Sequence, residues 1–223
     1  MREPPGTAGQ AAAEAPRVAV AILGRAPVAG EAKTRLIPRL GAPGAAALQA
    51  WMLQRAVANA LAADVGPVSL WCAGDPAHPE FALCRAFGNL SLRQQDAGDL
   101  GDRMLQALRE SPAPGGTLLV GTDCPALTPC LLRQAATALT KHEAVAIPAE
   151  DGGYVLLGAR RPAAELFAGV RWGSSLVMEQ TRNRLHALGW SWSEPATLWD
   201  VDRPEDLDRL LATCPEAREA IPC

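Results

Sequence analysis

Short apolar runs rich in β-branched residues alternate along this chain with segments whose apolar residues recur at helical spacing. Runs of the first kind fit buried strands, and the longer periodic segments fit amphipathic helices. The sequence predicts strands at residues 18–23, 68–72, 90–94, 117–121, 144–147 and 154–157. It predicts helices at residues 45–63, 79–87, 100–110, 129–141, 174–188 and 204–212. This alternation predicts an α/β, Rossmann-like fold with a mostly parallel central sheet and helices on both faces.

The pattern contains no internal repeat and no second composition regime, so we expect one domain over residues 17–223. Residues 1–16 consist mostly of Ala, Pro, Gly and Glu, and we expect them to form a disordered tail. In the last predicted helix, Pro204 stands at the first helical position. A backbone N–H there would have no intrahelical acceptor, so proline costs no hydrogen bond.

The composition excludes several classes of protein. The 223 residues carry a formal net charge of −3, whereas nucleic-acid-binding proteins usually have a basic excess. No uninterrupted apolar run approaches the roughly 18 residues that span a membrane. The six cysteines form no C-x-x-C pair and only three histidines are present, so we expect no structural zinc site. Residues 1–16 lack the apolar core of a secretory signal, and we therefore expect a cytoplasmic protein with free, buried thiols.

The loop that follows the first predicted strand has the composition of an anion-binding loop. In open α/β sheets, ligands bind in the loops at the carboxyl ends of the strands. Residues 24–36 match neither the Rossmann fingerprint nor the Walker A motif. They contain two glycines that allow close backbone approach and three cations, namely Gly24, Gly30, Arg25, Lys33 and Arg35. We expect a phosphate-binding loop with Lys33 at the surface; a solvated turn with ordinary surface charges is the alternative.

A second turn with two glycines, at residues 98–104, leads into a predicted helix. Gly98 and Gly101 flank Asp99, and Arg103 follows in the first turn of the helix. An Asp at this position can accept hydrogen bonds from the first backbone N–H groups of a helix. From the pattern alone we expect Asp99 to cap the helix.

Three aspartates are candidate metal ligands. Asp123 directly follows the predicted strand at residues 117–121, and Asp200 and Asp202 alternate just before the last predicted helix. Mg²⁺ is commonly held by one or two carboxylates together with phosphate oxygens, so convergence of these side chains would form a metal site. The alternatives are that Asp123 stabilises a turn and that Asp202 caps the last helix.

The loop at residues 148–154 places two carboxylates before two glycines. Asp151, Gly152 and Gly153 suit a loop that lies flat against a ligand, because glycine leaves the backbone uncovered. Asp-Gly is also a common hairpin signal, and both interpretations stay open at this point. Trp172 stands in a loop before a predicted helix and is a candidate ligand contact, whereas core packing is expected for most of the other tryptophans.

Taken in order, five segments resemble the signatures of a bacterial family with a glycosyltransferase-A-like fold, often called radical-SAM/selenodomain-associated transferase 1. The family motifs run F-A-K-x-P-x-x-G-x-x-K-T-R-L, G-D-L-G-x-R-M, G-T-D-x-P-x-L, P-A-x-D-G-G-Y-x-L-x-G and D-V-D-T-P-E-D-L. The matching segments are residues 23–36, 98–104, 121–127, 148–158 and 200–207, and the resemblance extends over residues 17–211. Arg25, Gly173 and Arg203 replace the family's Lys, Ser and Thr.

The resemblance implies the nucleotide-diphospho-sugar transferase fold, shared more distantly with phospholactate and molybdenum-cofactor guanylyltransferases. It implies that Asp123 binds a divalent cation, Mg²⁺ or Mn²⁺, with Asp200 or Asp202 as the second ligand. Lys33 and Arg25 would face the nucleotide phosphates and stabilise charge on the leaving group. The turn at residues 98–103 would hold the base or ribose, and Asp151 would act at the acceptor side together with the two glycines that follow it.

These inferences predict a divalent-metal-dependent, glycosyltransferase-like enzyme that uses a nucleotide or nucleotide-sugar donor and a small-molecule acceptor. The alternative is a nucleotidyltransferase that joins a nucleoside monophosphate to a phosphorylated small molecule, like the guanylyltransferase relatives. A non-catalytic nucleotide-binding module is the second alternative. It could lose its carboxylates, so the presence of Asp123, Asp151, Asp200 and Asp202 argues against it. The fold does not distinguish these activities.

Overall fold

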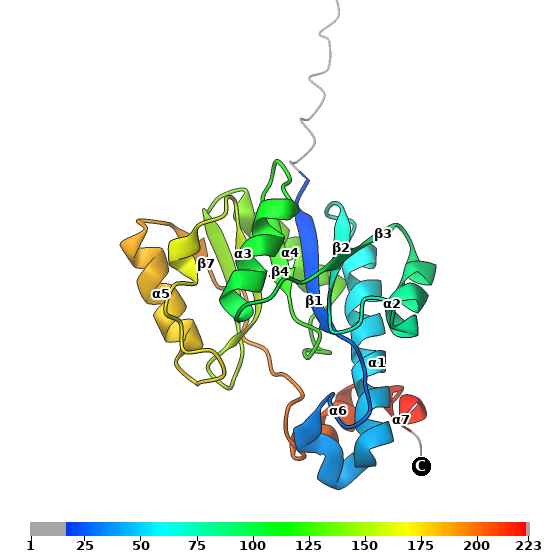
Figure 1. Cartoon of the computed structure of the whole chain (residues 1–223). Helices are drawn as coiled ribbons and strands as arrows, with labels where there is room; N and C mark the ends of the chain where they lie inside the picture. Colours follow the sequence, from blue (N-terminus) through cyan, green and yellow to red (C-terminus); the bar gives the residue numbers. More distant parts are fainter. Residues whose placement is uncertain (1–16, 222–223) are drawn as a thin grey trace, which may run out of the picture.

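The computed structural model describes residues 17–221, and a seven-stranded sheet forms its centre (Figure 1). The strands are β1 (Ala19–Arg25), β2 (Val68–Ala73), β3 (Leu90–Gln94), β4 (Thr117–Val120), β5 (Ala144–Pro148), β6 (Tyr154–Ala159) and β7 (Trp192–Ser193). Their order across the sheet is β3-β2-β1-β4-β6-β5-β7. All six predicted strands are present. The predicted disordered tail lies outside the described residues.

All neighbouring strands are parallel except where β6 is involved, since β6 runs antiparallel to both β4 and β5. The mostly parallel sheet is therefore confirmed. β6 is reversed because residues 149–153 connect it to β5, and such a short loop permits a hairpin but not the crossover that parallel neighbours need. As a result, the start of β6 lies at the same edge of the sheet as the ends of β4 and β5.

Helices cover both faces of the sheet, as predicted (Figure 1). The α-helices are α1 (Ile37–Ala63), α2 (Pro79–Leu83), α3 (Leu100–Glu110), α4 (Pro129–Leu139), α5 (Val177–Ala187), α6 (Asp206–Thr213) and α7 (Ala217–Ala220). Short 3-10 segments are η1 (Thr34–Leu36), η2 (Cys84–Phe87) and η3 (Ala164–Leu166). One core cluster contains side chains of α1 and α4, and a second contains side chains of α3 and α5 on the opposite face.

The central strand β1 contributes to both clusters. Val20 and Ile22 point toward α1 and α4, whereas Ala21 points toward α3 and α5, and all three are fully buried. Successive side chains of a strand point to opposite faces. The uninterrupted apolar run in β1 therefore reflects a strand that is covered on both sides.

A third apolar cluster joins the first half of α1 to the C-terminal helices α6 and α7. Leu48 and Met52 of α1 pack there with Trp199 and Val201 from the segment that precedes α6. Figure 1 shows α6, α7 and the start of α1 together, beyond the end of β1. This cluster fixes the position of residues 199–202.

The first and last helices have other boundaries than those predicted. α1 begins at Ile37, and a kink at Gly41, whose φ is +68°, separates its first turn from the remainder. α6 begins at Asp206, so Pro204 is not at its first helical position. The Asp206 carboxylate accepts hydrogen bonds from the backbone N–H groups of Asp202 and Arg203, which holds a turn ahead of the helix. The sequence does not predict the short elements β7 and α7, because so few residues leave no periodic pattern.

Two expectations from the composition concern thiols and membranes. Cys72, Cys84, Cys124 and Cys214 are free and buried, as expected, whereas Cys130 is free and exposed. Cys223 lies outside the described residues. In residues 17–221, no helix has the length and apolar character needed to cross a membrane.

Candidate active site

A pocket of about 610 Å³ opens at the edge of the sheet where β1 and β4 end. Its walls come from the loops after these two strands, from the β5–β6 hairpin and from the segment before α6. The predicted site residues that line it are Arg25, Lys33, Arg35, Asp123, Asp151, Gly153, Asp200 and Asp202. Loops that follow parallel strands meet at one edge of a sheet, which explains why residues so distant in sequence share this pocket.

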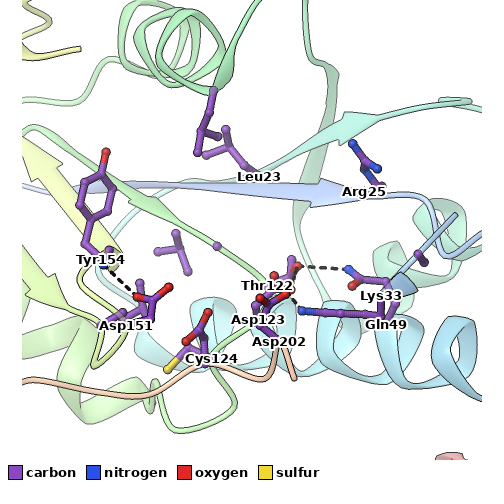
Figure 2. A pocket seen from close by; sticks show the side chains of 18 of the residues that line it. Leu23, Arg25, Lys33, Gln49, Thr122, Asp123, Cys124, Asp151, Tyr154 and Asp202 are labelled. Carbon is purple, nitrogen blue, oxygen red and sulfur yellow. Dashed lines mark hydrogen bonds and ion pairs between the residues drawn. The ribbon is translucent and has the colours of Figure 1, made fainter. Parts of the chain in front are cut away.

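Lys33 lies inside the pocket beside Asp123 (Figure 2). Its Nζ is 2.9 Å from Asp123 Oδ2 and donates a 2.6 Å hydrogen bond to the carbonyl oxygen of Val201. Only 5% of the Lys33 side chain is exposed, so the expectation of a surface cation is wrong. Its backbone is left-handed, with φ +48°, which is uncommon for a residue with a side chain. Lys33 thus joins the loop after β1 to the loop after β4 and to the segment before α6.

A buried chain of hydrogen bonds supports Asp123 from α1. Gln49 Nε2 donates to Thr122 Oγ1 at 3.2 Å, and Thr122 Oγ1 donates to Asp123 Oδ1 at 3.2 Å (Figure 2). Both Gln49 and Thr122 are buried. Gln49 is not predicted from the sequence, because one glutamine within a helix belongs to no motif, whereas Thr122 is part of the recognisable segment G-T-D.

Asp200 lies close enough to Asp151 and Asp123 to be affected by their charges. Burial, followed by the negative charges of Asp151 and Asp123, raises the pKa of the Asp200 carboxyl to about 6. The positive charge of Lys33 opposes this shift. All three carboxylates line the pocket, so this region is negatively charged, and the buried ammonium group of Lys33 lies beside Asp123.

Asp202 lines the same pocket but forms an ion pair with Arg35. Along this segment the side chains alternate, because Trp199 and Val201 are buried in the third apolar cluster while Asp200 and Asp202 line the pocket. This is the alternation of an extended chain. Arg35 and Asp202 thus neutralise one another, and the hydrogen bonds before α6 come from Asp206 rather than from Asp202.

The other predicted residues of the loop after β1 have different positions. Arg25 ends β1 on the pocket wall and forms no ion pair within residues 17–221. Gly24 and Gly30 lie outside the lining. A Cβ added to Gly24 would lie 2.8 Å from Leu53 Cδ1, so this glycine allows α1 to pack closely on β1. Gly30 has φ +88° and occupies a turn.

The β5–β6 loop is both a hairpin and a wall of the pocket. The backbone N–H of Gly153 donates to Asp151 Oδ1 at 2.8 Å, and the Asp151 carboxylate lines the pocket (Figure 2). Gly152 has φ +92°, and a Cβ added to it would lie 2.1 Å from the carbonyl oxygen of Ser175. The bare backbone of Gly152 therefore faces the loop before α5 rather than the pocket, while Gly153 lines the pocket. The hairpin interpretation is confirmed.

The turn before α3 is closed by the expected cap. Asp99 Oδ1 accepts a hydrogen bond from the backbone N–H of Asp102, and Asp102 Oδ2 accepts one from that of Asp99, which is a capping box. The pocket lining does not include Gly98, Asp99, Gly101 and Arg103. Leu100 and Met104, from the same helix, do line it.

Trp172 also lies outside the pocket lining. Its side chain packs against the core cluster of α3 and α5, and a Cβ added to Gly101 would be 2.9 Å from its ring. The indole Nε1 is buried and has no hydrogen-bond partner among the described residues. Trp172 therefore packs against the core between α3 and α5 and does not contact the pocket.

Apolar side chains form one part of the pocket wall, and none of them is predicted from the sequence as a site residue. Leu23, Leu100, Met104 and Tyr154 all line the pocket, and Figure 2 shows Leu23 and Tyr154 apart from the Lys33–Asp123 pair. The Tyr154 hydroxyl donates to Met104 Sδ at 3.5 Å, and burial raises the pKa of Tyr154. The pocket thus combines an acidic region with an apolar one.

The donor atoms in the pocket are carboxylate oxygens, which Mg²⁺ and Mn²⁺ prefer. In the described part of the chain, no three or more His, Cys, Asp or Glu side chains are grouped closely enough to hold a metal ion. The loop of Asp123 and the segment of Asp200 adjoin, because the backbone N–H of Val201 donates to the Asp123 carbonyl oxygen at 2.9 Å. Mg²⁺ typically takes one or two protein carboxylates and completes its shell with phosphate and water, and these residues fit that requirement.

The middle of the chain matches the model of a family described as uncharacterized proteins conserved in bacteria, DUF2064. The match covers residues 56–174, which is more than half of the 223 residues. The chain belongs to this family. The part matched by DUF2064 contains Asp123 and Asp151, whereas Lys33 and Asp200 flank it in sequence and join it in the pocket.

Solved structures similar to this DUF2064 protein share its fold. A candidate nucleotide-diphospho-sugar transferase from Desulfovibrio desulfuricans G20 is 27% identical, with a TM-score of 0.78 over 88% of this chain and 87% of that one. Rv0371c from Mycobacterium tuberculosis H37Rv, solved also in complex with manganese, is 20% identical with a TM-score of 0.51. That match covers 89% of this chain and 100% of Rv0371c.

The 4-diphosphocytidyl-2C-methyl-D-erythritol synthase of Anaerococcus prevotii is 11% identical, with a TM-score of 0.60 over 88% of this chain and 96% of that enzyme. The expected nucleotidyltransferase and GT-A-like fold is therefore confirmed. Among curated proteins, none matches this chain significantly.

Proposed function

We propose that this DUF2064 protein is a divalent-metal-dependent, glycosyltransferase-like enzyme that uses a nucleotide donor and a small-molecule acceptor. The observation that carries the proposal is the convergence of Asp123, Asp151 and Asp200 beside Lys33 in one pocket. The similarity to a candidate nucleotide-diphospho-sugar transferase supports it. Within this fold, the five sequence motifs support membership of the group often called radical-SAM/selenodomain-associated transferase 1.

Asp123 and Asp200 are the proposed ligands for Mg²⁺ or Mn²⁺. Asp202 is paired with Arg35, whereas Asp200 lies among other carboxylates that raise its pKa and that a cation would neutralise. When bound, the ion would offset negative charge on the nucleotide diphosphate. The manganese complex of Rv0371c supports this choice of ion.

The two cations Lys33 and Arg25 form the donor side of the proposed site. Both come from β1 or the loop after it, so a diphosphate placed next to Asp123 would lie within their reach. Their charges would stabilise the leaving diphosphate as its bond to the sugar breaks. Leu100 and Met104 offer an apolar surface for the base at the start of α3, near the turn that the motifs assign to the base or ribose.

Asp151 is the proposed general base on the acceptor side. Its carboxylate would accept the proton of an acceptor hydroxyl while that oxygen forms a bond to the anomeric carbon of the donor sugar. The bond from the anomeric carbon to the diphosphate breaks, and the nucleoside diphosphate leaves with the electron pair. A general base of this kind typically contributes roughly 10²–10⁴-fold to the rate.

Nucleotidyl transfer is the second candidate, and the fold shared with the 4-diphosphocytidyl-2C-methyl-D-erythritol synthase of A. prevotii is compatible with it. In that reaction a phosphate oxygen of the acceptor attacks the α-phosphorus of a nucleoside triphosphate, and pyrophosphate leaves. The same carboxylates and cations would serve either reaction, because negative charge develops on the leaving group in both: on the nucleoside diphosphate in glycosyl transfer and on pyrophosphate in nucleotidyl transfer.

A thermal-shift screen of nucleoside triphosphates and nucleotide sugars, each with Mn²⁺, tests the proposal. Ligands that bind only the folded state raise its stability, by about 2.7 kcal/mol at a hundredfold excess over Kd. We expect a shift with wild type that is lost in Asp123→Ala. Release of nucleoside diphosphate from a sugar donor would then indicate glycosyl transfer, and release of pyrophosphate would indicate nucleotidyl transfer.

Two results would contradict the proposal. If no nucleotide shifts the wild type, the protein does not use a nucleotide donor. If nucleotides bind equally to wild type and Asp123→Ala, and equally with and without Mn²⁺, the third candidate, a non-catalytic nucleotide-binding module, becomes the better description.

A further inference from the structure

Arg209, on α6, contacts the residues that directly precede two of the pocket carboxylates. Its guanidinium forms two hydrogen bonds with the carboxylate of Glu150, Nη1 to Oε2 at 2.7 Å and Nη2 to Oε1 at 3.0 Å. The same guanidinium lies over the ring of Trp199, 4.5 Å from its centroid. Glu150 precedes Asp151, and Trp199 precedes Asp200.

The two segments held by Arg209 also pair through their backbones. Ala149 and Leu198 form a parallel bridge, and the backbone N–H of Glu150 donates to the Leu198 carbonyl oxygen at 2.9 Å. The backbone N–H of Leu198 donates to the Pro148 carbonyl oxygen at 2.9 Å. This short backbone pairing ends just before Asp151 and Asp200. Beyond it, the side chain of Arg209 connects the two segments through Glu150 and Trp199.

Arg209 contacts the side chains that point away from the pocket, next to the two aspartates that point into it. Trp199 is buried in the apolar cluster while Asp200 lines the pocket, since consecutive side chains of an extended segment point to opposite sides. Glu150 and Asp151 lie in the β5–β6 turn, where Glu150 reaches α6 and Asp151 lines the pocket. Holding Glu150 and Trp199 on the side away from the pocket therefore keeps the two aspartates on the pocket side.

We propose that Arg209 is a positioning residue that sets the separation of Asp151 and Asp200 by holding Glu150 and Trp199 on one guanidinium plane. Arg209 does not line the pocket, so it acts through these neighbours. A planar guanidinium can stack on a ring and bind a carboxylate with two parallel bonds, and a lysine ammonium cannot do both. Supporting residues behind a metal ligand typically change metal affinity by 10–100-fold when they are removed.

This inference rests on the proposed metal site, and Mn²⁺ alone is the probe that tests it. Binding of Mn²⁺ is measured by electron paramagnetic resonance on wild type, Arg209→Ala, Arg209→Lys, Glu150→Gln and Asp123→Ala, well below the melting temperature of each. We expect at least a tenfold loss of Mn²⁺ affinity in Arg209→Ala and a clear loss in Arg209→Lys, because the lysine keeps the charge but not the geometry. Glu150→Gln should weaken binding in the same direction.

The pair Arg182–Glu194 provides a matched control. Arg182, on α5, binds Glu194 through Nε at 2.9 Å and Nη2 at 2.6 Å, and neither residue lines the pocket. Arg182→Ala therefore removes the same kind of two-bond pair and should leave Mn²⁺ affinity unchanged, because neither partner lines the pocket.

The outcomes separate the two proposals. If wild type binds Mn²⁺, Asp123→Ala does not, and Arg209→Ala and Arg209→Lys bind like wild type, then Arg209 has no positioning role and the metal site stands. If the loss in Arg209→Ala is no larger than in Arg182→Ala, the positioning role is overturned as well. If wild type does not bind Mn²⁺, or Asp123→Ala binds equally well, the proposed metal site fails and this inference fails with it.

Discussion

The ammonium group of Lys33 is shared between Asp123 and the backbone of Val201, which lies 168 residues further along the chain. The side chain is almost fully buried, and the backbone adopts a left-handed conformation that is unfavourable for lysine. Removal of the ammonium would leave the carbonyl oxygen without its donor and the neighbouring carboxylates without their nearest cation. Lys33 therefore has a structural role in addition to its proposed contact with the donor.

We predict that Lys33→Ala lowers the free energy of unfolding by about 1–3 kcal/mol, the range for a buried group that loses its partner. Arg35→Ala is the control, because its ion pair with Asp202 is exposed and should contribute less than about 1 kcal/mol. Urea unfolding of both variants measures the difference. Equal and small losses would mean that the buried pair does not stabilise the fold.

The thiols differ in their expected reactivity. Burial raises the pKa of Cys72 to about 11 and those of Cys84 and Cys124 to about 12, whereas Cys130 is exposed. Because the thiolate is the reactive form, a thiol of pKa 12 is only about one part in ten thousand ionised at pH 8. We predict that iodoacetamide at pH 8 modifies Cys130 in the native protein and spares the other three. Peptide mass mapping identifies the sites, and rapid modification of Cys84 or Cys124 would show that their burial is transient.

At the scale of elements, the β5–β6 hairpin and the loop before α5 approach each other closely at Gly152. A Cβ there would lie 2.1 Å from the Ser175 carbonyl oxygen, and the backbone N–H of Met178 donates to the Gly152 carbonyl oxygen at 2.8 Å. The hairpin that carries Asp151 is therefore supported by α5 on one side and by α6 on the other. Neither support is visible in the local sequence.

We predict that Gly152→Ala destabilises the protein by more than about 2 kcal/mol, because it combines an unfavourable φ with a clash against the backbone. Gly173→Ala is the matched control, since Gly173 has φ +74° but no atom within 4 Å of an added Cβ. Its cost should be limited to the conformational strain, about 1–2 kcal/mol. Thermal unfolding of both variants measures the difference, and equal costs would show that the contact with Ser175 is not restrictive.

Local patterns predict the elements better than they predict the site. The apolar runs identify six strands, and Asp99 and the Asp-Gly pair at Asp151 are recognisable because a cap and a hairpin depend on neighbouring residues. The pairing of Lys33 with Asp123 cannot be read from the sequence, since it depends on how distant loops meet. The supports Gln49 and Arg209 are missed for the same reason.

At the scale of the whole molecule, three apolar clusters stabilise the fold, and the third buries Trp199 and Val201, the residues on either side of Asp200. Leu210 of α6 is fully buried in that cluster, and Leu139 of α4 is fully buried in the first. The two leucines allow the same substitution in two different clusters, and neither lines the pocket.

We predict that Leu210→Ala and Leu139→Ala each cost about 2–5 kcal/mol in the free energy of unfolding, the usual range for a buried leucine. Only Leu210→Ala should also weaken Mn²⁺ binding, because it loosens the packing of Trp199 and Val201 around Asp200. Denaturant unfolding and Mn²⁺ titration of the two folded variants test this. Equal effects of both leucines on Mn²⁺ binding would show that the third cluster has no special relation to the pocket.

Three hydrogen bonds at or next to the pocket connect residues early in the chain to residues late in the chain. Lys33 to Val201, Arg35 to Asp202 and Arg39 to Pro204 are separated by 168, 167 and 165 residues. At synthesis rates of about 5–20 residues per second, the later partner of each bond follows the earlier one after roughly 10–30 s. During that interval β2 to β6 are synthesised one after another and can begin to pair with β1, before the backbone of Val201 is available to Lys33. The nascent chain can therefore pair these strands first, and the proposed metal and nucleotide site can be completed only after residues 199–202 have left the exit tunnel.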